Sequence, residues 1–170
     1  MTDLPNLTLI LGGARSGKSA LAEGLVQASG RPMVYLATAE PLDDEMSDRI
    51  QIHKDRRVGW TTVEEPLDVA AALDRIPAGS AILLDCLTLW LSNLMHHSKV
   101  DIDDMINALK QAKGPLVCVS NEVGMGLVPD TSLGREFRDL QGELNARVAT
   151  AANAVTFVAA GLPLSLKAPQ

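Results

Sequence analysis

Near its start the chain reads LTLILGGARSGKS, from Leu7 to Ser19. Its apolar beginning, Leu7–Leu11, predicts a buried strand, and residues with helical periodicity follow from Ser19 to Ala28. The glycine-rich part between them matches the pattern G-x-x-x-x-G-K-[ST] at every fixed position. A strand, this loop and a helix in that order form a phosphate-binding loop, so the segment predicts a nucleotide-binding α/β domain. The loop alone does not tell which reaction follows.

The residue types of this loop suit phosphate. Glycines carry no Cβ atom, so backbone N–H groups can approach phosphate oxygens at the positive end of the following helix. Lys18 supplies a positive charge for the β- and γ-phosphates, and the Ser19 hydroxyl is a ligand that Mg²⁺ accepts. We therefore predict that Lys18 is catalytic and that the nucleotide contacts the whole loop: Gly12, Gly13, Ala14, Arg15, Ser16, Gly17, Lys18 and Ser19.

The remaining chain alternates short apolar runs with segments of helical periodicity. The runs are too short for helices and predict buried parallel strands: Met33–Ala37, Ala81–Leu84, Leu116–Ser120 and Val155–Ala159, with Thr61–Val63 as a further candidate. Helical segments are expected at Asp68–Leu73, around Leu87, Leu91 and Leu94, after Asp101 as N-cap, and along Leu133, Phe137, Leu140, Leu144 and Val148. This alternation predicts βαβ units, and so an α/β fold with a mostly parallel sheet and helices on both faces.

Composition restricts the class of protein further. The 170 residues, 46% of them hydrophobic and 21% charged, fit one nucleotide-binding domain over residues 1–170. A net charge of −6 and 3% aromatic residues do not suit a nucleic-acid binder, so we expect no nucleic-acid partner. No apolar run reaches the ~18 residues of a membrane span and no basic flank marks a signal peptide, which predicts a cytoplasmic protein. Cys86 and Cys118 have apolar neighbours and are expected to be buried, reduced thiols.

A carboxylate follows the apolar run Ala81–Leu84. Asp85 at the end of a buried strand is typical of the acidic residue that holds Mg²⁺, directly or through water, in phosphate-loop proteins. Asp85 also precedes a helical segment, so an N-cap is the alternative interpretation. The phosphate loop favours the metal, and we predict that Asp85 and Ser19 are its protein ligands.

A histidine lies in a segment with an unusual density of cations for an acidic chain. The segment from Asp43 to Arg57 has acids at its start and bases at its end, as a helix prefers. His53 shares a face with Met46 and Ile50, which is the usual pattern of a core histidine. The neighbouring cations Lys54, Arg56 and Arg57 suit a triphosphate, with the imidazole as a nucleophile at phosphorus. A solvated basic helix end explains them equally well.

Taken together, these segments resemble the bifunctional adenosylcobinamide kinase/adenosylcobinamide-phosphate guanylyltransferase family of cobalamin biosynthesis. The resemblance covers nearly the whole chain. It is carried by GGARSGKS (Gly12–Ser19), LATAEPLDDEMSDRIQIHKDRR (Leu36–Arg57), WTTVEEP (Trp60–Pro66), LLDCLTLWLSNL (Leu83–Leu94) and SNEVGMGLVPDTSLGREFRDLQGELNARVA (Ser120–Ala149). Many families share the first stretch, whereas the other four, in this order and spacing, are specific. The resemblance implies a three-layer P-loop NTPase fold of the RecA-like type.

The resemblance also assigns residues. In the family a histidine of an R-I-x-x-H segment forms a guanylyl intermediate, and the matching segment here is Arg49–His53, which makes His53 catalytic. Some members carry a second histidine just before it, and this chain has Ile52 there. The nucleotide contacts of the family fall on the phosphate loop and on Ala37, Thr38, Ala39, Lys54, Asp55, Arg56, Arg57, Glu64 and Asp85.

Two reactions are implied. ATP or GTP first phosphorylates the aminopropanol hydroxyl of adenosylcobinamide, with Mg²⁺ as cofactor. His53 then takes GMP from GTP and releases pyrophosphate, and the new phosphate of the corrinoid accepts the GMP to give adenosylcobinamide-GDP. The expected partners are thus the corrinoid and GTP or ATP, and the family resemblance implies a trimer.

Two other functions stay open on the residues alone. One is a small-molecule kinase that never uses His53, although the arginine-rich lid of adenylate- and shikimate-type kinases is missing. The other is a nucleotide-switched binding module. Such a switch needs a residue such as Gln to orient water after the Asp85 strand, and Cys86, Leu87 and Thr88 supply none.

A second loop at the carboxyl ends of the strands is harder to interpret. Asn121 and Glu122 follow the run Leu116–Ser120, at the edge where open α/β sheets bind ligands. They are candidates for contact with the corrinoid or the nucleotide. A loop that needs Gly124 and Gly126 only for their backbone conformation is as good an interpretation.

Three further segments have weaker signals in the sequence. His96 and His97 at a helix end are expected on the surface, interacting with the helix dipole. Leucines of the segment Leu87–Leu94, if exposed, would serve an interface between subunits. The last residues, Lys167–Gln170, are expected to be frayed.

Overall fold

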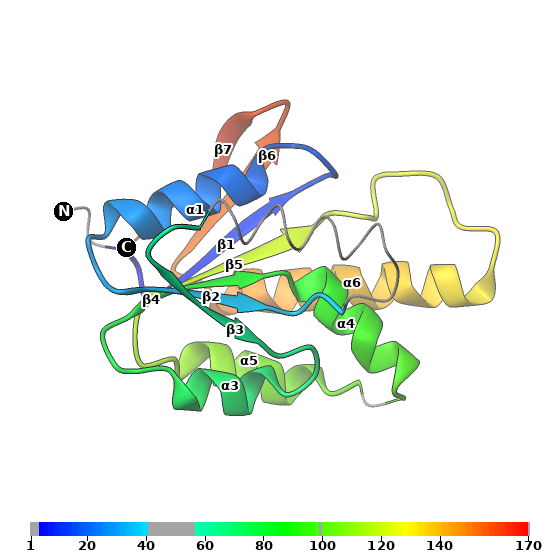
Figure 1. Cartoon of the computed structure of the whole chain (residues 1–170). Helices are drawn as coiled ribbons and strands as arrows, with labels where there is room; N and C mark the ends of the chain where they lie inside the picture. Colours follow the sequence, from blue (N-terminus) through cyan, green and yellow to red (C-terminus); the bar gives the residue numbers. More distant parts are fainter. Residues whose placement is uncertain (1–3, 41–56, 99, 170) are drawn as a thin grey trace.

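The computed structural model describes residues 4–40, 57–98 and 100–169. In these residues seven strands form one sheet in the order β3-β2-β4-β5-β1-β6-β7 (Figure 1). All neighbouring strands are parallel except β6 and β7, which form an antiparallel hairpin. The strands are β1 (Leu7–Gly12), β2 (Met33–Ala37), β3 (Trp60–Glu64), β4 (Ala81–Asp85), β5 (Leu116–Asn121), β6 (Ala154–Ala159) and β7 (Leu162–Lys167).

Helices cover both faces of this sheet, as the sequence predicts. They are α1 (Lys18–Ala28), α3 (Val69–Arg75), α4 (Leu87–His96), α5 (Ile102–Lys110) and α6 (Ser132–Ala151). Figure 1 shows α1 on one face and the other four on the opposite face. Asp68 and Asp101 cap α3 and α5, because their side chains accept hydrogen bonds from the N–H groups of Ala71 and Asp104. In the described residues, no helix combines the length and apolar character of a membrane span.

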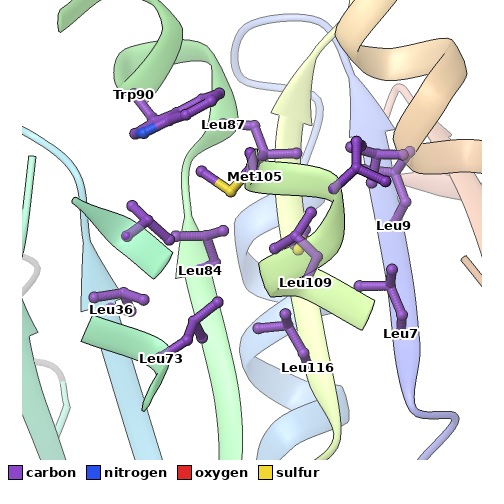
Figure 2. Close-up of a cluster of buried hydrophobic side chains, with 14 of the residues drawn as sticks. Leu7, Leu9, Leu36, Leu73, Leu84, Leu87, Trp90, Met105, Leu109 and Leu116 are labelled. Carbon is purple, nitrogen blue, oxygen red and sulfur yellow. The ribbon is translucent and has the colours of Figure 1, made fainter. Parts of the chain in front are cut away.

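Alternation along the strands divides the core into two clusters. Leu7, Leu9, Leu36, Leu84 and Leu116 point towards the four-helix face, where they meet α3, α4, α5 and α6 (Figure 2). Their strand neighbours point towards α1, and this second cluster includes Ile10, Tyr35, Leu83, Val117 and Val119. A sheet that is buried on both faces explains why its strands are continuous apolar runs in the sequence.

All predicted strands are confirmed, including the short one at Thr61–Val63, which lies within β3. Cys86 and Cys118 are confirmed as buried and free. Burial raises the pKa of the Cys86 thiol to about 11 and that of Cys118 further, so both are protonated at neutral pH.

Three expectations are wrong. Lys167 is not frayed: it ends β7, and its Nζ donates hydrogen bonds to the carbonyls of Ala149 and Thr150 at the end of α6. Leu133 begins the predicted apolar stripe of α6 but is 61% exposed. Three of the α4 leucines are not exposed, because Leu87, Leu91 and Leu94 are buried against the sheet, and among the leucines of this helix only Leu89 is half-buried.

Candidate active site

The phosphate loop connects β1 to α1 at the carboxyl edge of the sheet, where the sequence places it. Two of its residues have left-handed backbone, Arg15 with φ 56° and Gly17 with φ 97°. Gly17 is the N-cap of α1, so the following N–H groups lie at the positive end of this helix. The Lys18 Nζ donates a hydrogen bond to Gly13 O at 3.1 Å, which holds the ammonium group against the loop.

Steric fit requires glycine at only some positions of this loop. A Cβ atom at Gly12 would lie 2.5 Å from Val158 O and 2.6 Å from the Ser16 Oγ, so a larger residue would displace the loop. A Cβ atom at Gly13 would meet no other atom within 4 Å. The Ser16 hydroxyl is buried and has no hydrogen-bond partner among the described residues. Such an orphan polar group is uncommon and often marks a ligand site.

The turn between β6 and β7 packs against the phosphate loop. Gly161 donates its N–H to Ser16 O at 2.9 Å, and a Cβ atom at Gly17 would lie 3.4 Å from the Gly161 Cα. Ala160 and Gly161 both have positive φ, which is the backbone of a two-residue hairpin turn that matches the twist of its strands. This support is not predicted from the sequence. Its signal was the small pair Ala160-Gly161 between two strand-like runs.

Asp85 lies at the end of β4, beside the end of β2. Its side-chain Oδ2 accepts a hydrogen bond from the Tyr35 hydroxyl at 3.2 Å, and its backbone oxygen accepts one from the Thr38 N–H at 3.3 Å. Cys86, and not Asp85, is the N-cap of α4, so the alternative role of Asp85 as a cap is wrong. The Asp85 carboxylate is therefore held by Tyr35 of β2, and it does not cap α4.

Tyr35 is itself held by a buried ion pair. The Arg57 guanidinium lies over the Tyr35 ring, 3.4 Å from its centroid, and pairs with the Glu23 carboxylate of α1 at 2.9 Å. Burial and the nearby Asp85 raise the pKa of Tyr35, and the Arg57 charge only partly opposes this, so the phenol stays protonated and donates to Asp85. Arg57 is 6% exposed. Its predicted contact with nucleotide stays a prediction, and its position in the structure links α1 to the Asp85 carboxylate.

The predicted contacts next to β2 have different surroundings. Thr38 is fully buried, and its hydroxyl donates to Cys86 O at 2.7 Å and accepts from Cys86 N at 2.9 Å. These two hydrogen bonds to the Cys86 backbone fix the β4–α4 connection after Asp85. Ala37 pairs in register with Glu64 at the end of β3, and the Glu64 side chain is exposed. Ala39 follows Thr38 and is half-buried at the same edge.

The end of β5 is joined to the phosphate loop and to two helices. Glu122 donates its N–H to Gly12 O at 3.2 Å, and Asn121 donates its N–H to the Thr88 Oγ1 at 2.8 Å. The Asn145 amide of α6 donates to Asn121 O at 3.0 Å. A purely conformational need for glycine in this loop is not supported, because neither Gly124 nor Gly126 has positive φ.

Four predicted residues, His53, Lys54, Asp55 and Arg56, lie outside the described residues, and their roles stay predictions.

His96 and His97 are exposed as expected. The His96 Nδ1 lies 2.8 Å from Ser92 O, and the His97 Nε2 lies 4.0 Å from the Glu40 carboxylate. The structure thus brings the loop, Ala37–Ala39, Glu64 and Asp85 to one edge of the sheet.

A parallel sheet with this loop at its carboxyl edge defines the class: the chain is a P-loop NTPase-like α/β protein. Solved structures agree on the fold. The flagellar accessory protein FlaH from Methanocaldococcus jannaschii matches 98% of this chain and 80% of its own, with a TM-score of 0.61 and 16% identity. An ATPase from a bacterial type III secretion system matches 95% of this chain and 57% of its own, with a TM-score of 0.53 and 11% identity.

Sequence comparison assigns the family. The model of the cobinamide kinase / cobinamide phosphate guanyltransferase family matches residues 8–166, so the chain belongs to that family. Among curated relatives, the bifunctional adenosylcobalamin biosynthesis protein CobP of Pseudomonas aeruginosa is 45% identical, with 94% of this chain and 96% of the relative covered. The protein CobU of Salmonella typhimurium is 40% identical, with 95% of this chain and 99% of the relative covered. The resemblance drawn from the sequence is therefore confirmed.

Proposed function

We propose that this protein phosphorylates adenosylcobinamide and then transfers GMP from GTP to the product. The proposal rests chiefly on one observation: a complete phosphate loop, with Lys18 bonded to it, lies at the same edge of the sheet as Asp85 in a chain of the cobinamide kinase family. The names of its relatives state that they are bifunctional, and they align with it over nearly their whole length. Both activities fit one nucleotide site at the carboxyl edge of the sheet.

In the kinase reaction, the loop amides and Lys18 hold the β- and γ-phosphates. The hydroxyl oxygen of the corrinoid arm attacks the γ-phosphorus and its proton is released to solvent, while the bond to the β-phosphate oxygen breaks and the nucleoside diphosphate leaves. The donor set of Ser19 and Asp85, a hydroxyl and a carboxylate, suits Mg²⁺, which usually takes few protein ligands and completes its shell with phosphate oxygens and water. Bound there, Mg²⁺ supplies charge neutralisation at the phosphates. ATP and GTP present the same triphosphate to the loop, and both are proposed as donors.

In the second reaction, we assign His53 as the nucleophile. Its imidazole nitrogen attacks the α-phosphorus of GTP, a P–N bond forms, and pyrophosphate leaves with the electrons of the broken P–O bond. A phosphate oxygen of the corrinoid product then attacks the same phosphorus. The P–N bond breaks, His53 is restored, and adenosylcobinamide-GDP is formed. Lys54, Asp55, Arg56, Arg57 and Glu64 are proposed as further contacts of the nucleotide.

Location and assembly follow from the same assignment. We place the protein in the cytoplasm, where nucleoside triphosphates are available as substrates. We also propose a homotrimer, by resemblance to the family. Light scattering on the purified protein checks the assembly, and a monomer mass would contradict it.

One labelling experiment separates the two activities. Incubation with GTP labelled at the α-phosphate should leave a covalent label that is labile to acid and stable to base, as a phosphoramidate is. His53→Ala should abolish this label and keep γ-phosphoryl transfer to adenosylcobinamide. His97→Ala removes an exposed histidine far from this chemistry in the sequence and serves as the matched control with full labelling.

Measurements of covalent label and of γ-phosphoryl transfer also distinguish the two alternative functions, a small-molecule kinase and a nucleotide-switched binding module. Lys18→Ala should lower γ-transfer by at least about a hundredfold, the usual cost of losing one charge that stabilises a transition state. A small-molecule kinase without the second activity would transfer the γ-phosphate and never acquire label. A nucleotide-switched module would hydrolyse GTP slowly and phosphorylate no corrinoid.

A further inference from the structure

The connection between β5 and α6 exposes large apolar side chains at the edge that holds the phosphate loop. Met125 is 80% exposed, Leu127 97% and Val128 64%. Leu133, 61% exposed, follows them at the start of α6. Figure 1 shows this connection (yellow) extending outward beyond the ends of the strands. Exposed apolar residues that gather beside a site usually serve binding.

The topology directs an acceptor substrate towards this connection. In the sheet, β1 and its phosphate loop lie between β5 and β6. On the β6 side, the short hairpin turn is packed against the loop through the Gly161–Ser16 hydrogen bond. On the β5 side, Glu122 is bonded to Gly12, and the chain then extends through residues 123–131 before α6 begins. Among the described residues, the long connection that leaves the sheet beside the phosphate loop is thus the one on the β5 side.

This connection has a rigid base. The Ser120 hydroxyl donates to the Asn145 Oδ1 at 2.6 Å, and the Gln141 amide donates to the same Oδ1 at 2.9 Å. All three side chains are buried, and they join the end of β5 to α6. A buried and bonded network of this kind fixes the position of the segment that leaves it. The exposed apolar residues are thus presented from a fixed point next to the phosphate loop.

A cleft between α4 and α6 adjoins the end of this connection at Thr131 and Leu133. It has a volume of about 310 Å³ and is lined by Met95 and His96 at the end of α4 and by Thr131, Leu133 and Phe137 at the start of α6. Its walls combine apolar side chains with a hydroxyl and an imidazole at the rim. The charged residues of the connection are Glu122 and Asp130, and the Arg135 guanidinium of α6 donates to the carbonyls of Pro129 and Asp130 at 2.9 Å. The surface therefore carries charges of both signs, and its exposed side chains suit a large, partly apolar ligand.

We propose that the surface formed by Met125, Leu127, Val128 and the cleft at Leu133 binds the corrinoid ring. This inference rests on the proposed function. A corrin ring is broad and carries methyl groups and amide side chains around its rim, so it matches an exposed apolar surface with polar and charged neighbours. With the ring on this surface, the hydroxyl-bearing arm extends towards the phosphate loop through the Glu122 end of the connection.

The test compares substitutions of two exposed leucines, one on the proposed corrinoid surface and one on β7. Leu127→Ser should raise the KM for adenosylcobinamide in the kinase reaction about tenfold, since a leucine loses apolar contact with the ligand. Leu164→Ser removes a leucine that is 60% exposed on the edge strand β7, outside the proposed corrinoid surface, and it should leave that KM unchanged. Equilibrium dialysis with adenosylcobinamide should show the same ratio of affinities without any turnover.

The outcomes separate this inference from the proposed function. Nucleotide binding and covalent labelling from GTP do not need the corrinoid, so Leu127→Ser should retain both. If wild-type protein phosphorylates adenosylcobinamide and Leu127→Ser has an unchanged KM, the surface is not the corrinoid site. A change of oligomeric mass in Leu127→Ser, with an unchanged KM, would make it a subunit interface. If the wild-type protein phosphorylates no corrinoid, the proposed function itself fails.

Discussion

The two edges of the sheet are built differently. At the amino edge the turns bond to one another through their backbones, as Gly79 N does with Lys113 O at 3.1 Å and Asn153 N with Leu7 O at 2.8 Å. At the carboxyl edge, Arg15 has a left-handed backbone without being glycine, and the Ser16 hydroxyl is buried without a partner among the described residues. Left-handed backbone at a non-glycine residue and an unpaired buried hydroxyl both cost free energy.

This difference separates stability from function. The unsatisfied Ser16 hydroxyl lies in the phosphate loop and remains available to phosphate, whereas the unsatisfied Thr8 hydroxyl near the start of β1 is enclosed between neighbouring strands. A substitution at the amino edge should therefore change the free energy of unfolding and leave the chemistry of the folded molecules alone. A substitution at the carboxyl edge should do the reverse. The following variants test that division.

The largest effect is expected at the amino edge, at Gly114. A Cβ atom there would overlap the backbone oxygen of Ser80, which cannot move as a side-chain end can. Gly114→Ala should lower the free energy of unfolding by about 3 kcal/mol or more, as severe overpacking does. Urea denaturation measures the loss. Nucleotide affinity per folded molecule should stay that of the wild type.

Gly142→Ala is the matched control for this substitution. Gly142 is exposed in the middle of α6, and a Cβ atom there meets nothing within 4 Å. Alanine should stabilise the helix by about 1 kcal/mol because it favours helical backbone. Equal losses in both variants would show that Gly114 has no special steric role. A loss of nucleotide affinity in folded Gly114→Ala would break the division between the two edges.

A smaller effect is expected at the carboxyl edge, from Tyr35→Phe. The substitution removes the hydroxyl that donates to Asp85 and keeps the ring beneath Arg57. Groups that orient a metal ligand typically change metal affinity about tenfold or more when they are lost. We expect about tenfold weaker binding of Mn²⁺, used as a spectroscopic substitute for Mg²⁺, in the presence of a non-hydrolysable nucleotide. Nucleotide affinity without metal should be unchanged.

Thr8→Val provides the comparison for Tyr35→Phe. Thr8 also carries a buried hydroxyl within the sheet, and that hydroxyl has no hydrogen-bond partner among the described residues. Its removal should leave Mn²⁺ binding as it is and slightly stabilise the fold. Unchanged Mn²⁺ affinity in Tyr35→Phe would mean that the Tyr35–Asp85 bond serves packing only.

The sequence predicts best what depends on local pattern. Buried parallel strands are continuous apolar runs, and the phosphate loop has a fixed spacing, so both were found. The strand β7 was not predicted, although Leu162, Leu164 and Leu166 alternate with other residues as in a strand, because Pro163 interrupts the run. All three leucines are exposed, as an edge strand with an open face allows.

Long-range partners were equally hidden. Arg57 belongs to a basic cluster in the sequence, which suggested phosphate, and only the fold brings it to Glu23, 34 positions away, and to Tyr35. The same holds for the hairpin turn that supports Ser16. The residue type predicts that Arg57 binds an anion, but only the folded structure shows whether this anion is a ligand or a carboxylate side chain.

The smallest effect is expected from Lys167→Met, at the amino edge. Lys167 is the last residue of β7. Its Nζ donates hydrogen bonds to carbonyls at the end of α6, where a positive charge is favourable. Methionine keeps most of the apolar stem and loses the charge, which should cost about 1 kcal/mol of unfolding free energy, measured in urea. Lys110→Met, at the exposed end of α5, is the control and should cost a few tenths of a kcal/mol at most. High salt should narrow the difference between the two variants, because exposed charges are screened. Equal losses at low salt would mean that Lys167 does not hold the end of α6, and β7 would then owe its place in the sheet to its pairing with β6 alone.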